Sequence, residues 1–417
     1  MNSILRNPKF QLAASFIAMM MVGNLQYTWT LFVEPIREGR SWELTGIQFA
    51  YTIYIAIQTW TQPATGWFID RIGQRPFITA AGILAGVGWS MIGHASSLPQ
   101  LYIFYGMAAV GAAFVYSGSM GSALKWFPTR RGFASGVIAA GYGGGSAISV
   151  WIIRYLIRDY SYTTAFLTSG IVQGIVIVVV AQFLRHPDKD FVAAKAASPS
   201  PVAATKSRKG SDNFTSLEML ATPQFYVLFV MFVAVGVGGL FLTANSGSMA
   251  KSWGLSATLT AAASFGLLAN AGSRPFWGWV SDKWGRESTM VVAFTLQALF
   301  LVCLGTFGQG SGVMFAATLI LTYFTWGEIY SIFPAMVGDF FGSKNATSNN
   351  SFLYAAKGVA ALIIFLLQYV HEYFQSWSAA LYASAILAIL TAIAAFAIRH
   401  MPLPTKTDHK SMAAASS

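Results

Sequence analysis

The sequence predicts an all-α polytopic membrane protein whose twelve transmembrane helices form two pseudo-symmetric six-helix bundles. Of the 417 residues, 55% are hydrophobic and only 10% are charged, and the mean hydropathy is +0.55. These values lie outside the range of ordinary soluble domains. The chain also contains twelve apolar runs of roughly 18 to 25 residues, the length that an α-helix needs to cross about 30 Å of hydrocarbon. A repeat between the two halves of the chain completes the prediction.

The twelve apolar runs form two groups of six on either side of a polar stretch. The predicted spans are 10–33, 47–69, 77–94, 99–122, 133–156, 163–184, 223–245, 258–281, 288–308, 312–337, 349–370 and 377–398. The polar stretch is rich in Ala, Ser, Pro and Lys and has too little apolar content to pack, which predicts a flexible linker. We therefore expect an N-terminal bundle, a cytoplasmic linker, a C-terminal bundle and a cytoplasmic tail over residues 1–184, 185–222, 223–398 and 399–417.

Basic residues are concentrated on one side of the predicted membrane. The chain has 26 Lys and Arg against 15 Asp and Glu, a formal net charge of +11. If the N-terminus is cytoplasmic, 19 of these cations lie in cytoplasmic segments and 5 in or beside outer loops, as the positive-inside rule requires. We therefore expect a multi-pass protein of the cell (inner or plasma) membrane with both termini in the cytoplasm, and a monomer. Because the positive charge has this topological explanation, we expect no nucleic-acid partner.

The two remaining cations, Arg274 and Lys357, lie inside predicted helices. A charge at bilayer depth costs at least ~2.5 kcal/mol, so such residues normally face a polar interior and mark a pathway or binding site. Each is about eight residues, or ~12 Å, from the cytoplasmic end of its helix. The two cations therefore share one depth, and without a matching pair of acids they predict an anionic substrate.

The two halves of the chain repeat each other at an offset of 212 residues. PATGWFIDRIGQR (63–75) aligns with PFWGWVSDKWGR (275–286), so Asp70 corresponds to Asp282. Many secondary transporters are built from such duplicated units, with the substrate site at the interface of the halves.

The repeat is asymmetric at the intramembrane cations. Gln62 stands at the place of Arg274, and Gly141 stands at the place of Lys357. Both cations therefore belong to the second half only.

Aromatic residues share the depth of the cations. Tyr330 and Tyr116 are expected at ~12 to 13 Å from the cytoplasmic face and Trp326 at ~18 Å. Arginine takes a carboxylate through two parallel hydrogen bonds and lysine supplies a compact charge, while Tyr and Trp rings exclude water and still offer an O–H or N–H donor. This layer predicts a site for a small carboxylate anion.

The repeated loop resembles a known signature. Its pattern G-x-x-x-D-R-x-G-x-R resembles the loop motif of the major facilitator superfamily, and the second copy is degenerate. Asp70, Arg71, Arg75 and Asp282 are expected to tether helix ends and bias the conformational switch without touching substrate. More narrowly, the chain resembles the oxalate/formate antiporter family. The segments that carry this resemblance are LQYTWTLF, KWFPTRRGFASGVIAAGYG, SLEMLATPQFYVLF, SRPFWGWVSDKWGR, FTWGEIYSIFP and YAAKG.

The resemblance implies an alternating-access antiporter, most simply of oxalate against formate, with no cofactor. It implies that Arg274 and Lys357 bind the carboxylates. The residues expected to line the pocket are Gln26, Tyr27, Tyr116, Trp326 and Tyr330, to which Tyr354 is added because it lies three residues before Lys357. A dianion between two cations would leave the site neutral, so that the loaded carrier switches while the empty one resists.

Three positions depart from the family pattern, which has glutamine, tryptophan and glycine where this chain has Ile55, Tyr354 and Glu328. An ionised Glu328 near the pocket would reduce its charge to +1 and favour a monocarboxylate or a proton-coupled cycle, which makes it a candidate proton or charge-balance site. Glu328 lies two residues from both Trp326 and Tyr330 and should point away from their face, so a structural pair with Lys357 is the alternative.

The rival function is a proton-coupled monocarboxylate symporter. Carriers of that kind have a D-x-x-x-R pattern on the eighth helix. In this chain Asn270, which cannot carry a proton, stands four residues before Arg274. A receptor would need a sizeable signalling domain, and the tails are short. The sequence has no set of nucleophile, base or metal ligands that would predict an enzyme. The glycine-rich segment GYGGG (141–145) lacks the preceding strand and the GK(S/T) ending of a phosphate loop, so it predicts close helix packing.

Overall fold

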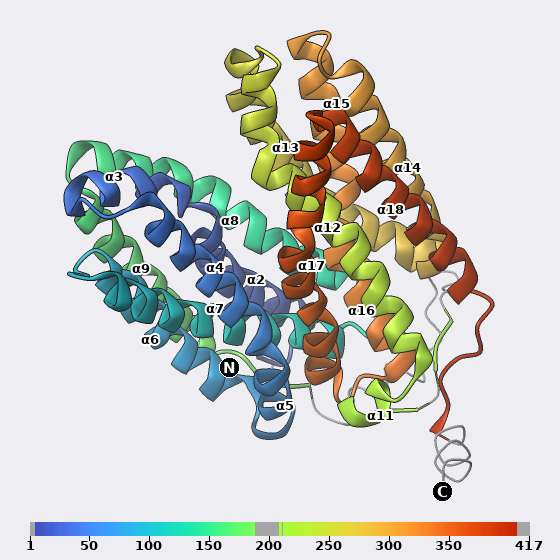
Figure 1. Cartoon of the computed structure of the whole chain (residues 1–417). Helices are drawn as coiled ribbons and strands as arrows, with labels where there is room; N and C mark the ends of the chain where they lie inside the picture. The colour runs from blue at the N-terminus through green and yellow to red at the C-terminus, as the bar shows by residue number, and fades with distance from the viewer. Residues whose placement is uncertain (1–4, 188–207, 211, 407–417) are drawn as a thin grey trace, which may run out of the picture. The chain divides into compact units, whose positions relative to one another are not determined.

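The structure, a computed structural model, describes residues 5–187, 208–210 and 212–406, and Figure 1 shows its helices. The helices of the first half are α2 (Pro8–Tyr27), α3 (Thr30–Arg40), α4 (Leu44–Trp60), α5 (Gln62–Ile72), α6 (Gln74–Ile92), α7 (Leu98–Trp126), α8 (Arg131–Asp159) and α9 (Tyr162–Ala181). Those of the second half are α11 (Ser216–Leu220), α12 (Pro223–Ser252), α13 (Ser256–Trp284), α14 (Arg286–Phe307), α15 (Gly312–Trp326), α16 (Ile329–Phe341), α17 (Ala346–Phe374) and α18 (Trp377–Ile398).

Each of the twelve predicted spans coincides with a helix or a broken helix pair. The first, second and tenth spans are the pairs α2 with α3, α4 with α5, and α15 with α16. Within the described residues, nine helices are long and apolar enough to cross a membrane, or ten if the 49° bend between α2 and α3 lies within one span. Helix α13, which carries Arg274, is not among them because its polar residues lower its hydropathy.

Two of the breaks fall at identifiable residues. Pro63 is the second residue of α5, where its missing N–H and its ring favour a new helix start over continuation of α4. The break between α15 and α16 falls at Gly327 and Glu328. The second of these breaks lies between Trp326 and Tyr330, two residues of the predicted site.

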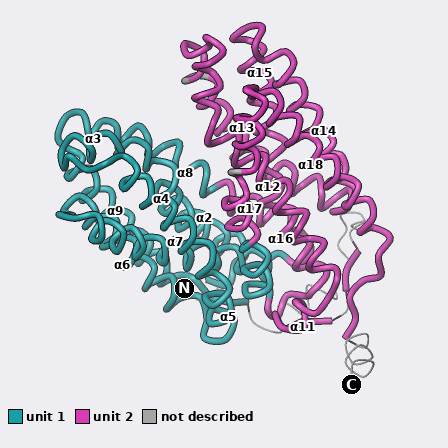
Figure 2. The backbone as a smooth tube through the Cα atoms, in the orientation of Figure 1, with its two compact units in different colours: residues 1–127, 141–195, 346–355 teal, residues 128–140, 196–345, 356–417 magenta. Residues whose placement is uncertain are grey.

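The described chain divides into two compact units, coloured separately in Figure 2. Unit 1 comprises residues 1–127, 141–195 and 346–355, and unit 2 comprises 128–140, 196–345 and 356–417. The first turns of α8 therefore belong to unit 2, and the first turns of α17 belong to unit 1. The bundle boundaries predicted at 184 and 223 follow the chain and do not show this exchange.

Glycines allow the helices of unit 1 to approach closely. A Cβ on Gly86 of α6 would lie 2.9 Å from the Cα of Gly174 on α9, and a Cβ on Gly82 would lie 2.9 Å from the carbonyl oxygen of Gly174. Small residues at crossings of this kind bring membrane helices into van der Waals contact where no hydrophobic effect drives association.

The end of the predicted linker is ordered in unit 2, whereas residues 188–207 and 211 lie outside the described residues. Arg208 donates hydrogen bonds to the carbonyl oxygens of Ile398, Arg399 and Met401. Helix α11 begins with a capping box formed by Thr215 and Glu218, which satisfies two backbone N–H groups at its start. The bonds of Arg208 attach the linker end to the end of α18 and to the residues that follow it.

His186, just after α9, is enclosed within unit 1. One of its ring nitrogens lies 3.2 Å from the carbonyl oxygen of Ile69 at the end of α5. Burial, together with the neighbouring Lys125 cation, lowers the pKa of His186 to about 4. The imidazole is therefore neutral at physiological pH.

We expect acid to release this contact. Because the pKa is lower in the folded than in the unfolded chain, the contact is fully stable above the ordinary histidine pKa of ~6.5 and loses stability as the pH falls towards 4. Hydrogen exchange, corrected for intrinsic rates, should show protection at residues 184–186 falling at least about tenfold between pH 6.5 and pH 4. His186→Gln should remove this pH dependence, and a decrease that persists in the variant would contradict the assignment.

Candidate substrate-binding site

Arg274 lies in the middle of α13 and is 2% exposed. Its Nη1 donates a hydrogen bond of 2.5 Å to the carbonyl oxygen of Ala139, and its Nη2 donates one of 2.7 Å to Oδ1 of Asn270. Among the described residues, Nε has no hydrogen-bond partner and no carboxylate lies within ion-pair distance of the guanidinium. Neutral dipoles therefore hold this cation, and the protein supplies no counter-charge to it.

Asn270 fixes the orientation of this guanidinium. Its Nδ2 donates a 2.9 Å hydrogen bond to the carbonyl oxygen of Tyr323 on α15, while its Oδ1 accepts from Arg274. The amide thus connects α13 to α15 and aims the arginine. The i, i+4 spacing of Asn270 and Arg274 in the sequence could have indicated this role. From the sequence, Asn270 is interpreted only as a residue that cannot carry a proton.

Tyr330 contacts both Arg274 and Trp326, two other residues of the predicted site. The guanidinium carbon of Arg274 lies 4.6 Å from the centre of the Tyr330 ring, within cation–π range. The Trp326 and Tyr330 rings meet edge to face at 5.8 Å. The indole passes over Gly239 of α12, where a Cβ would lie 1.9 Å from the ring. Among the described residues, the buried Nε1 of Trp326 has no hydrogen-bond acceptor.

Lys357 is the second buried cation of unit 2. It is 3% exposed on α17 and interacts electrostatically with Arg274 as a like charge. Like charges that share a low-dielectric region repel each other more strongly than in water. An anion that interacts with both groups would relieve this repulsion.

Glu328 lies in the break between α15 and α16 and is 0% exposed. Neither of its carboxyl oxygens has a hydrogen-bond partner among the described residues. The predicted alternative, an ion pair with Lys357, is absent from the part of the chain that the structure describes. The neighbouring Gly327 packs on α13, because a Cβ there would lie 2.0 Å from Oγ of Ser273 and 3.3 Å from Cγ of Arg274.

The other predicted pocket residues gather around Tyr142 in unit 1. The hydroxyl of Tyr142 donates a 2.8 Å hydrogen bond to Oε1 of Gln26. Its ring lies edge-on to Tyr27 at 5.7 Å and to Tyr116 at 5.9 Å. The ring of Tyr354, in the first turns of α17, lies 4.2 Å from that of Tyr116. Tyr142 thus contacts three residues that the sequence predicts separately, and Tyr354 joins them through Tyr116.

The sequence prediction missed Tyr142 because it lies in the glycine-rich segment 141–145. That segment allows the close packing expected of it, since a Cβ on Gly145 would lie 2.3 Å from the carbonyl oxygen of Met20 and one on Gly23 would lie 1.9 Å from that of Tyr142. The same close approach of α2 and α8 brings the Tyr142 hydroxyl to Gln26.

Gln62, the counterpart of Arg274, has a different environment in unit 1. Its Nε2 donates a 3.1 Å hydrogen bond to the carbonyl oxygen of Gln58, and its Oε1 accepts a 3.3 Å bond from Ser117. The Ser117 hydroxyl also accepts from Ser351 at 3.1 Å. The position that carries a cation in one half carries a neutral, satisfied amide in the other.

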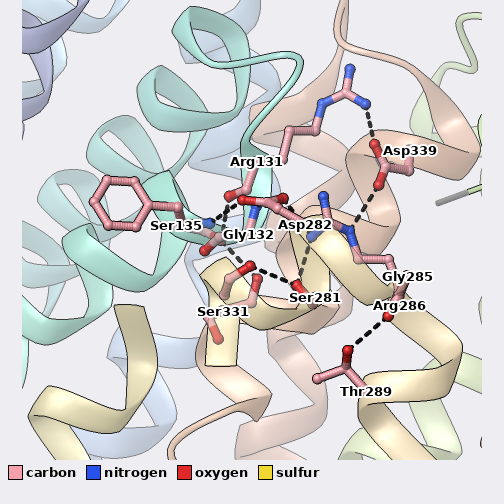
Figure 3. A network of polar contacts seen from close by, with 12 residues as sticks. Arg131, Gly132, Ser135, Ser281, Asp282, Gly285, Arg286, Thr289, Ser331 and Asp339 are labelled. Atoms are coloured by element: carbon pink, nitrogen blue, oxygen red, sulfur yellow. Dashed lines mark hydrogen bonds and ion pairs between the residues drawn. The ribbon is translucent and has the colours of Figure 1, made fainter. Parts of the chain in front are cut away.

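Asp282, in the second copy of the repeated loop, belongs to the network of charges drawn in Figure 3. It accepts hydrogen bonds of 3.0 and 2.8 Å from the backbone N–H groups of Gly132 and Phe133, and it forms a 2.6 Å ion pair with Arg286. The N–H groups belong to the start of α8, where a carboxylate also interacts favourably with the helix dipole.

Asp339 is the second acid of this network. It forms ion pairs with Arg131 at 2.5 Å and with Arg286 at 2.9 Å (Figure 3). Asp339 therefore stands between two buried arginines, and Arg286 pairs with both acids of the network.

Asp70, in the first copy of the loop, makes the equivalent contacts in unit 1. It forms a 2.5 Å ion pair with Lys125 and accepts a 2.8 Å hydrogen bond from the backbone N–H of Ser348. Ser348 lies in the first turn of α17. Each aspartate of the repeat thus caps a helix that begins in the other half of the sequence.

The two arginines of the first loop lie outside these networks. Arg75 donates hydrogen bonds of 3.0 and 2.7 Å to Oε1 of Gln182, which joins the start of α6 to the end of α9. The guanidinium of Arg71 lies 3.7 Å above the ring of Trp67 in its own helix. Among the described residues the contact found for Arg71 is therefore within its own helix, and its expected role as a tether stays a prediction.

Comparison with known proteins agrees with this architecture. The family model of the Major Facilitator Superfamily matches residues 12–244 and 227–416. The chain is 36% identical to the oxalate:formate antiporter of Oxalobacter formigenes, over 97% of the chain and 94% of that protein. It is 26% identical to the human monocarboxylate transporter 14, but over only 39% of the chain and 32% of that protein.

Solved structures show the same fold at low sequence identity. The proton:xylose symporter XylE superposes with a TM-score of 0.74 at 12% identity, covering 94% of this chain and 95% of that one. The E. coli fucose:proton symporter FucP gives 0.67 at 11% identity over 94% and 99%. Both have the twelve-helix fold, which confirms the predicted fold class. The repeated loop, the paired halves and the match along the chain together establish that this protein belongs to the major facilitator superfamily of membrane transporters.

Proposed function

We propose that this transporter exchanges small carboxylates by alternating access, with oxalate against formate as its substrates. The observation that carries the proposal is the buried Arg274, which neutral dipoles hold in unit 2 together with the second buried cation, Lys357. The similarity to an oxalate:formate antiporter along nearly the whole chain supports the choice of substrates. We propose further that the protein is a monomer in the cell membrane with both termini in the cytoplasm.

In this proposal Arg274 binds one carboxylate group and Lys357 the other. Nε of Arg274 and Nε1 of Trp326 are buried donors without acceptors among the described residues, and a small planar anion supplies acceptors. Oxalate carries two negative charges, so it neutralises the two cations when it binds. The empty site keeps two like charges in low dielectric, which opposes passage through a closed intermediate and makes transport an exchange.

The exchange itself is tested first, with purified protein in liposomes preloaded with oxalate, with formate or with buffer alone. We expect uptake of labelled oxalate to require an internal carboxylate and to be insensitive to a pH gradient. Uptake into empty vesicles that follows an inward proton gradient would show the rival symport instead. Arg274→Lys and Lys357→Gln should each raise the KM for oxalate by about 10- to 100-fold, because a hydrogen bond to a charged group contributes about 1.5 to 3 kcal/mol.

Asn270 should control the affinity without binding substrate. Asn270→Ala removes the 2.7 Å bond that orients Arg274, so we expect the KM to rise about tenfold. Asn270→Asp places a carboxylate beside the guanidinium and should weaken oxalate binding further, because the protein then supplies the counter-charge. Asn245→Ala is the matched control, since within the described residues the Asn245 side chain donates to the carbonyl oxygen of Phe241 one turn earlier in α12. Equal KM values for the two alanine variants would contradict this role.

A second function, proton-coupled transport of a monocarboxylate, is favoured by Glu328 alone. An ionised carboxylate without partners is costly to bury, so we propose that Glu328 carries a proton in this conformation. Glu328→Gln imitates the neutral acid. If the protein is an exchanger, the variant should retain oxalate exchange within about twofold of the unmodified protein. If transport is coupled to protons through Glu328, uptake driven by a pH gradient should be lost in the variant, and carboxylate counterflow should remain.

A further inference from the structure

Two exposed tryptophans carry a cation on their rings at the ends of α5 and α13. The guanidinium carbon of Arg71 lies 3.7 Å from the ring centre of Trp67, and the ammonium of Lys283 lies 4.0 Å from that of Trp279. Trp67 is 41% exposed and Trp279 is 46% exposed. In both cases the cation follows the tryptophan by four residues, so the two side chains lie on one face of the helix.

The two pairs occupy equivalent places in the repeat. The offset of 212 residues that relates Asp70 to Asp282 also relates Trp67 to Trp279 and places Lys283 at the position of Arg71. Of the three intervening residues, the aspartate is shared and the other two differ between the copies. The arrangement is therefore present once in each unit, on the outer face of a loop whose aspartate is directed inward.

Neither cation of these pairs has a protein counter-charge among the described residues. The carboxylates at the same helix ends are already engaged, Asp70 with Lys125 and Asp282 with Arg286. The ring faces hold Arg71 and Lys283 in place and leave their N–H groups free to donate to an anion.

The surroundings of the pairs are apolar and exposed. Phe68 and Ile72 are 43% and 62% exposed beside the first pair, and Phe276 and Trp284 are 43% and 59% exposed beside the second. In a membrane protein, an exposed apolar face is covered by acyl chains, and aromatic rings with cations mark the level of the headgroups. The ligand that fits apolar surface and an uncompensated cation together is a phospholipid with negative charge.

We propose that Trp67 with Arg71 and Trp279 with Lys283 form two equivalent binding sites for the headgroups of anionic phospholipids. The cation binds the lipid phosphate, and the indole supports the cation and contacts the upper acyl chain. Each site lies within one unit. A lipid that binds there contacts the same loop whose aspartate caps α17 or α8, so lipid composition should influence how firmly those loops are held.

The proposal is tested by native mass spectrometry of the full chain, purified in detergent and titrated with phosphatidylglycerol or phosphatidylcholine. We expect two phosphatidylglycerol molecules to be retained preferentially. Arg71→Gln and Lys283→Gln should each remove one, and the double variant should bind phosphatidylglycerol at least tenfold more weakly. Trp67→Ala and Trp279→Ala should act in the same direction.

Trp151→Ala is the matched control, because Trp151 is 71% exposed on α8 and carries no cation on its ring in the described part of the chain. Monodisperse elution and an unchanged thermal midpoint in lipid-free detergent show that each variant is folded. Equal retention of phosphatidylglycerol by the double variant and the unmodified protein would overturn the proposal. Displacement of the lipid by millimolar inorganic phosphate would also overturn it, because the sites would then bind a soluble anion.

Discussion

A charged side chain that is buried away from water needs either a counter-charge or hydrogen-bonding dipoles around it. The buried ionic side chains of this transporter differ in which of these two kinds of partner stabilises them. Asp339 receives two arginines, and Asp282 receives one arginine and the first N–H groups of α8. Within the described part of the chain, the hydrogen-bond acceptors of Arg274 are a backbone carbonyl and an amide oxygen. The first group of charges is balanced by the protein, whereas Arg274 remains able to attract an anion.

The same constraint explains why a neutral residue accompanies Arg274. A carboxylate at position 270 would satisfy the guanidinium and also weaken its attraction for a substrate. Asn270 has the same shape and accepts the same hydrogen bond without adding charge, and its own N–H is satisfied by Tyr323. Tyr330 contributes a ring face, which stabilises the cation without compensating it. Orientation and charge are thus controlled separately.

The duplicated halves share scaffold contacts and differ in chemistry. Asp70 and Asp282 each cap a helix from the other half of the sequence, so the repeated loop has one structural role in both copies. At the equivalent intramembrane position, Gln62 has neutral partners, whereas Arg274 has an uncompensated charge. If Arg274 and Lys357 bind the exchanged carboxylates as proposed, one set of buried cations is enough, and each additional uncompensated charge would lower the stability of the protein.

The sequence by itself determined the twelve helices and identified both buried cations, because apolar length and the cost of intramembrane charge are properties of each segment in its solvent. Only the tertiary structure decided that Tyr142 joins Gln26, Tyr27 and Tyr116, and that Asn270 orients Arg274. It also decided that Glu328 lies in a helix break and forms no ion pair with any residue that the structure describes. These relationships depend on which residues of distant helices meet, which is set by side-chain packing and small residues at the crossings, and local sequence does not encode it.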